Sequence, residues 1–116
     1  MVLLAFWILT LAVAAGSGLA LWHMRGLSRP PLPAGIAHAT VGAVGLGLLL
    51  LALGGPPRGV AAGAGSFGAI AAGLFTVALL TGFVLLLLQR KGVVMAIHAG
   101  IAITGYVMVM AWALLG

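Results

Sequence analysis

Apolar residues fill the chain in four long runs, separated by three short breaks of a different composition. The runs are Val2–Trp22, Ala34–Gly54, Phe67–Leu88 and Val93–Leu115. Because a bilayer core of about 30 Å requires roughly 20 apolar residues in helical form, each run predicts a membrane-spanning helix. Two breaks, "HMRGLSRPPLP" and "GGPPRGVAAGAGS", are rich in Pro or Gly, and the third is the basic turn "QRKG". Connections this short make neighbouring helices antiparallel, so the sequence predicts an all-α, up-down-up-down four-helix bundle forming one transmembrane domain over residues 1–116.

Composition supports the membrane assignment. The chain is 65% hydrophobic and only 4% charged, whereas soluble domains carry roughly 25% charged residues. So few charged side chains cannot cover a water-exposed surface, and we expect an integral membrane protein.

The charged residues are all basic, with five Lys/Arg, no Asp or Glu and a net charge of +5. The absence of carboxylates argues against ion-coupled transport through an embedded acid, against paired-carboxylate hydrolysis and against carboxylate cation sites. The absence of cysteine excludes thiolate metal sites and disulfides. We expect anionic lipids as partners, and no nucleic acid.

The distribution of these charges predicts an orientation in the membrane. Arg25, Arg29, Arg90 and Lys91 lie in the first and third connections, while the second connection holds only Arg58. The positive-inside rule therefore places the first and third connections in the cytoplasm and both termini outside.

The two halves of the chain are similar to each other. Each has a Gly near the end of its first run, then a basic turn, then a His followed by a Gly seven positions later. The equivalent positions are Gly18 with Gly82, His38 with His98, and Gly45 with Gly105. This pattern predicts two repeated helical hairpins.

The two equivalent histidines are the candidate metal ligands. A His inside a membrane helix is costly and is normally explained by a partner. His38 and His98 lie at the same depth on parallel helices, diagonal in a bundle that closes in sequence order. We expect diagonal axes to be too far apart for a direct hydrogen bond between the imidazoles, but suited to one metal held by both. Glycine at Gly42, Gly45 and Gly105, on the same helix faces, leaves room for a flat cofactor.

A simpler explanation stays open for each histidine. Its ring can hydrogen-bond a backbone carbonyl or a hydroxyl of a neighbouring helix. Four threonines are candidates, namely Thr40, Thr76, Thr81 and Thr104.

Paired histidines on parallel helices with small residues on their inner faces resemble the membrane b-type cytochromes with four-helix haem cores. The resemblance implies one haem b held by His38 and His98, and electron transfer within a respiratory or photosynthetic membrane complex, with quinone as a candidate partner. It also implies that basic residues near the cytoplasmic side surround the haem propionates. These are His23, Arg25, Arg29, Arg90 and Lys91.

An accessory subunit without a redox role is the alternative. Its histidines would serve the bundle or ligate a chlorophyll-type pigment, and other membrane subunits would be its partners. In neither case do we expect an independent enzyme. The "LP…H" pattern after a basic turn also resembles small four-span bacterial membrane proteins, a resemblance that implies no activity. We expect a bacterial inner membrane protein. Trp7, Trp22, Trp112 and Tyr106 are expected to be interfacial anchors or lipid-facing residues.

Overall fold

Four helices make up the fold, as the sequence predicts. The computed structural model describes residues 1–26, 29–88 and 92–116, and these contain no strand. The helices are α1 (Val2–Met24), α2 (Leu32–Leu53), α3 (Phe67–Leu88) and α4 (Val93–Leu114). Each is long and apolar enough to cross a membrane. The chain therefore has the four spans of an integral membrane protein.

The observed helix ends differ from the predicted ones by no more than two residues. Helix α1 continues through His23 to Met24 and stops before Gly26, whose φ of +67° is a left-handed turn conformation that favours glycine. Helix α2 starts at Leu32 because Pro33 is accommodated in the first helical turn, where the missing N–H is not needed.

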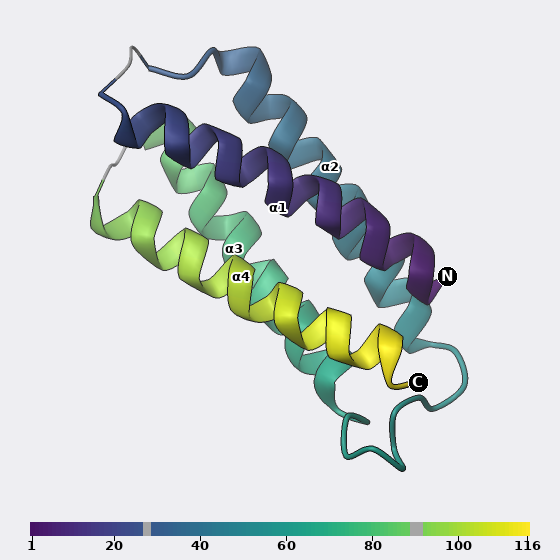
Figure 1. Ribbon diagram of the computed structural model, residues 1–116. Helices are drawn as coiled ribbons and strands as arrows, with labels where there is room; N and C mark the ends of the chain where they lie inside the picture. Colours follow the sequence, from purple (N-terminus) through teal and green to yellow (C-terminus); the bar gives the residue numbers. More distant parts are fainter. Residues whose placement is uncertain (27–28, 89–91) are drawn as a thin grey trace.

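The helices form a closed square rather than a row (Figure 1). Helix α1 packs against α2 and α4, and α3 packs against the same two neighbours. Consequently α2 and α4 are diagonal, as expected from sequence order. The chain termini and the α2–α3 connection lie at one end of the bundle, which we call the core end. The α1–α2 and α3–α4 connections lie at the other end, which we call the histidine end.

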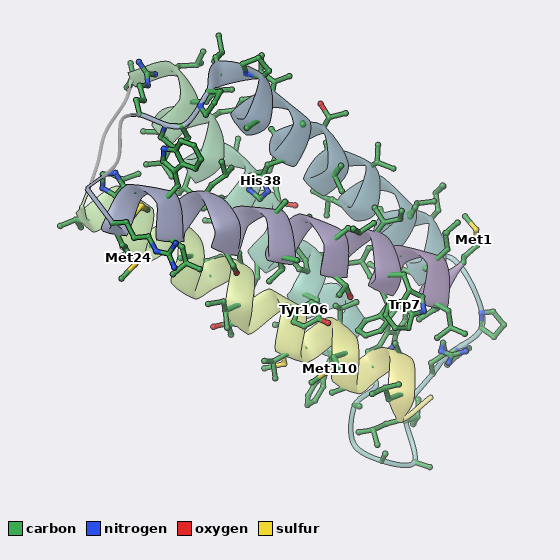
Figure 2. The ribbon with its side chains drawn as sticks, turned by 45° about the horizontal axis from the view of Figure 1, so that its top comes forward. Met1, Trp7, Met24, His38, Tyr106 and Met110 are labelled. Carbon is green, nitrogen blue, oxygen red and sulfur yellow. The ribbon has the colours of Figure 1, made fainter. Side chains whose placement is uncertain are left out.

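The hydrophobic core is confined to the core end. Its members come from all four helices and include three residues with no exposed surface among the larger side chains, Leu9, Leu49 and Val109. Trp112 is also in this cluster, only 3% exposed, and its ring lies against Gly68 of α3. The expectation that Trp112 is an interfacial or lipid-facing residue is therefore wrong. Trp7, by contrast, is 61% exposed (Figure 2).

Two polar contacts close the core end. The Tyr106 hydroxyl of α4 lies 3.0 Å from the Thr10 hydroxyl of α1, and the Tyr106 ring stacks on Phe6. The Arg58 guanidinium, from the α2–α3 connection, donates to the Ala113 carbonyl at 3.3 Å. A cation is favourable there because the C-terminus of a helix carries partial negative charge. These contacts join α1 to α4 and fasten the connection to the end of α4.

Candidate cofactor site

The histidine end of the bundle is hollow. The buried residues of α1 lie at or before Ala12 and those of α2 at or after Gly45, while those of α3 stop at Ala78 and those of α4 start at Gly105. Beyond these positions the four helices surround a largely apolar cavity of about 540 Å³. Small-molecule and cofactor pockets typically measure about 300–1,000 Å³, so this cavity is large enough for a cofactor.

Both candidate histidines line this cavity. His38 enters from α2 and lies in the bundle interior (Figure 2), and His98 enters from the diagonal helix α4. Their ring centroids are 6.1 Å apart and their planes are nearly perpendicular, at 84°. No hydrogen bond in the described part of the chain joins the two rings. Helix pairing thus brings the two histidine rings together across the diagonal, edge to face, without a hydrogen bond between them.

His98 has protein partners at one ring nitrogen. Its Nδ1 lies 2.8 Å from the Ala78 carbonyl of α3 and 3.2 Å from the Thr81 hydroxyl. A carbonyl oxygen only accepts, so Nδ1 carries the proton and donates a hydrogen bond to the Ala78 carbonyl. In the neutral ring, Nε2 then keeps its lone pair and is the nitrogen available to a ligand. The hydrogen bond to Ala78 is sufficient to satisfy Nδ1 of a histidine in a membrane helix. It is also the kind of hydrogen bond that metal-ligating histidines normally make through their other ring nitrogen.

Only one of the predicted threonine partners contacts a histidine. The other three hydroxyls donate to carbonyls of their own helices one turn earlier. These bonds are Thr40 to Ile36, Thr76 to Ala72 and Thr104 to Gly100.

His38 has the same neighbours as His98 but lacks its hydrogen bond. The His38 ring packs on Gly16 of α1, where an added Cβ would lie 2.8 Å from His38 Cε1. The His98 ring packs on Gly82 of α3 in the same way, at 3.1 Å. The Ala12 carbonyl lies near the His38 ring, but His38 Nδ1 is buried and has no partner among the residues that the structure describes.

The two hairpins therefore make equivalent contacts around their histidines, but one predicted pair of equivalent residues, Gly18 with Gly82, is wrong. The glycine equivalent to Gly82 is Gly16, whereas Gly18 has no atom within 4 Å of an added Cβ among the described residues. Sequence alignment missed Gly16 because the two glycines are close together in a small-residue run. The pair Ala12 and Gly16, matched to Ala78 and Gly82, was the signal that would have found it.

The glycines predicted to make room for a cofactor divide into two groups. Gly42 lines the cavity, and nothing described lies within 4 Å of an added Cβ there. Gly45 instead contacts Leu9, with a 2.7 Å approach to Cδ2, and Gly105 contacts Leu74 and Phe75. Gly45 and Gly105 are absent from the described lining of the cavity. The structure gives these two a helix-packing contact within each hairpin.

The cavity extends to the basic α1–α2 connection. His23, Met24 and Arg29 line this end of it. Arg25 is exposed and is not among the described residues that line the cavity. Arg90 and Lys91 lie outside the described residues. Of the predicted propionate partners, the structure thus brings His23 and Arg29 to the cavity.

The described residues bring together two imidazoles and no larger set of metal-ligating side chains. No group of three or more His, Cys, Asp or Glu that could hold a metal occurs in the described ranges, and protein zinc sites take three or four such ligands. Two imidazoles are sufficient when the cofactor supplies the other ligands. Metal–nitrogen bonds of about 2 Å, plus roughly 1 Å from each nitrogen to its ring centre, place two imidazole centres on one metal about 6 Å apart. The observed distance between the ring centroids, 6.1 Å, is of this size, with the two ring planes nearly perpendicular.

Comparison with protein-family models, curated proteins and solved structures finds no match for this chain.

Proposed function

We propose that the chain is a small membrane b-type cytochrome-like subunit that binds one haem b through His38 and His98. The observation that carries this proposal is the pair of imidazoles with ring centres 6.1 Å apart inside an apolar cavity at one end of the bundle. Haem, when bound, supplies a one-electron redox centre whose potential the protein sets through its ligands and surroundings.

The chain's own residues supply what such a centre requires. The hydrogen bond from His98 Nδ1 to Ala78 fixes the ring orientation and leaves Nε2 available. The wall of the cavity around the two rings is largely apolar. His23 and Arg29, which line the cavity near the α1–α2 connection, would bind the carboxylates of the propionates.

The location follows from the same proposal and from the charge distribution. With Arg25 and Arg29 on the cytoplasmic side, both termini lie outside and the cavity lies at the cytoplasmic end of the bundle. We propose a bacterial inner membrane, and a role in electron transfer within a respiratory or photosynthetic complex, with other membrane subunits and quinone as candidate partners. Because the chain carries a single pair of embedded histidines, it would hold one haem and would need such a partner to move electrons across the membrane.

The proposal predicts a visible absorption spectrum. The detergent-purified chain, loaded with haem b, is expected to give a low-spin b-type spectrum that sharpens on dithionite reduction. His38→Ala and His98→Ala should each change that spectrum, while Thr104→Val, which removes a hydroxyl bonded only to its own helix, should not. A folded, haem-treated wild-type protein with no haem spectrum would disprove the cytochrome assignment.

A second candidate is an accessory subunit without a redox role. It is favoured by the Ala78 and Thr81 contacts, which satisfy His98 Nδ1 without any cofactor. In that case His98→Ala would lower the thermal stability of the bundle and no variant would affect a spectrum. A chlorophyll-type pigment in place of haem would be recognised by its own absorption in the native membrane.

A further inference from the structure

The two hairpins surround their histidines with equivalent residues, except at one position. In each hairpin an alanine carbonyl lies near the imidazole and a glycine one turn later packs on it. The residue just before that glycine is Thr81 in the second hairpin and Ala15 in the first. The hydroxyl of Thr81 is therefore present at His98 and absent at His38.

This difference coincides with a difference in hydrogen bonding. His98 Nδ1 has the Ala78 carbonyl at 2.8 Å and the Thr81 hydroxyl at 3.2 Å. His38 Nδ1 is buried and lacks a partner in the part of the chain that the structure describes. An outer hydrogen bond at Nδ1 fixes the tautomer and orientation of a ligating imidazole and makes its other nitrogen a stronger donor. At His98 that support is a short hydrogen bond together with a hydroxyl, whereas at His38 the Ala12 carbonyl lies near the ring without completing such a bond at Nδ1.

The space around the rings differs in the same direction. One helical turn beyond His98 is Ala102, and one turn beyond His38 is Gly42; both line the cavity. An added Cβ at Gly42 would meet none of the described atoms within 4 Å. One turn beyond His38 the cavity wall is thus open, whereas α4 carries the Ala102 methyl group at the equivalent position.

We propose that the two imidazoles are unequal ligands: His98 is the fixed ligand, and His38 is an exchangeable ligand whose side of the cofactor admits a small uncharged ligand such as a diatomic gas. This inference rests on the proposed haem site. It adds that the subunit binds an external small molecule in competition with His38, and that Thr81 is a positioning residue for His98.

The first test compares the two histidine variants in the full-length chain reconstituted with haem b. His38→Ala is expected to retain haem with a five-coordinate, high-spin spectrum. His98→Ala is expected to bind haem at least about tenfold more weakly than His38→Ala, the lower end of the 10–100-fold effect of outer hydrogen bonds on metal affinity. Circular dichroism and gel filtration of each variant establish that it is folded.

The second test uses carbon monoxide as the probe and does not remove a ligand. The reduced, haem-loaded wild type is expected to bind CO and change its spectrum. Ala15→Thr, which places a hydroxyl at the position equivalent to Thr81, should slow CO binding several-fold by supporting His38. Thr81→Val should weaken haem binding without slowing CO.

The outcomes separate the two proposals. A low-spin haem spectrum combined with equal haem loss in both histidine variants, or with no CO binding, would overturn the inference and leave the haem site intact. If the folded wild type takes up no haem at all, the cytochrome assignment and the inference built on it both fail.

Discussion

Gly16 and Gly82 are the residues on which the placement of the imidazoles depends most directly. Each lies on the helix paired with a histidine helix, and each leaves a ring in contact with bare backbone. A methyl group at Gly16 would lie 2.8 Å from His38 Cε1, well inside van der Waals contact. The two rings reach the cavity centre from opposite sides because neither facing helix carries a side chain there.

A matched pair of substitutions on α1 tests this role. Gly16→Ala is expected to displace the His38 ring and so to alter the haem spectrum. Overpacking should also lower the free energy of unfolding by about 1–3 kcal/mol. Gly18→Ala, two residues away, meets no described atom within 4 Å. It should keep the spectrum and leave stability unchanged or raised by about 0.5–1 kcal/mol, because Ala is the better helix former. Equal behaviour of the two variants in thermal unfolding and absorption would contradict this account.

Within each hairpin, a large side chain of each helix packs against a glycine of the other helix. On α2, His38 is followed seven residues later by Gly45; on α1, Leu9 is followed seven residues later by Gly16. Because the helices are antiparallel, His38 meets Gly16 while Leu9 meets Gly45. This explains the seven-residue spacing by packing between paired helices.

The second hairpin uses the same arrangement. Phe75 and Gly82 on α3 face Gly105 and His98 on α4. The spacing recurs because both hairpins solve the same packing problem, so it does not by itself identify a cofactor. The evidence for a ligand at this scale is instead the cavity that the paired hairpins leave between them.

The core end has a comparable glycine contact that can be tested by stability alone. An added Cβ at Gly68 of α3 would lie 2.7 Å from the Trp112 ring and 2.9 Å from Leu53. Since Trp112 is buried, Gly68→Ala is expected to destabilise the bundle by about 1–3 kcal/mol in detergent. Gly73→Ala, on the same helix with nothing described within 4 Å, is the control and should not destabilise it. A Gly68→Ala protein as stable as the control would mean that the Trp112 contact is not tight.

At the scale of the whole molecule, the bundle has one packed end and one hollow end. The packed end holds the hydrophobic core, the Tyr106–Thr10 contact and the Arg58 contact to α4. The hollow end holds both histidines, and its cavity extends to Arg29. The tightly packed core and the cavity of the proposed cofactor site thus lie at opposite ends. Substitutions in the core should change the free energy of unfolding more than they change haem binding. Substitutions in the cavity should change haem binding more than the free energy of unfolding.

The orientation of these ends in the membrane can be measured directly, because the chain has no cysteine of its own. Ser66→Cys, in the α2–α3 connection, is expected to react with a membrane-impermeant maleimide added to intact spheroplasts. Met24→Cys, at the histidine end and 73% exposed, should react only after lysis. The reverse pattern would place the histidine end outside and contradict the orientation inferred from the basic residues.

The sequence by itself determined the four helices, their order and the confinement of both histidines to one end. Long apolar runs interrupted by Pro, Gly and basic residues leave the backbone one way to satisfy its hydrogen bonds in lipid, so the spans were predicted to within two residues. Short connections then made sequential helices neighbours and the two histidine helices diagonal. All of this depends on composition and length, which a sequence displays directly.

Only the tertiary structure decided what each small or polar residue touches. It shows that Gly16, not Gly18, is the glycine equivalent to Gly82, and that Gly45 and Gly105 contact side chains of the paired helix. It also shows that Trp112 is buried in the core. It also selected Thr81 from four threonines as the one beside a histidine. These choices depend on the rotation of each helix about its axis. In uniformly apolar helices no polar stripe marks that rotation, and it is set by how side chains of neighbouring helices interlock.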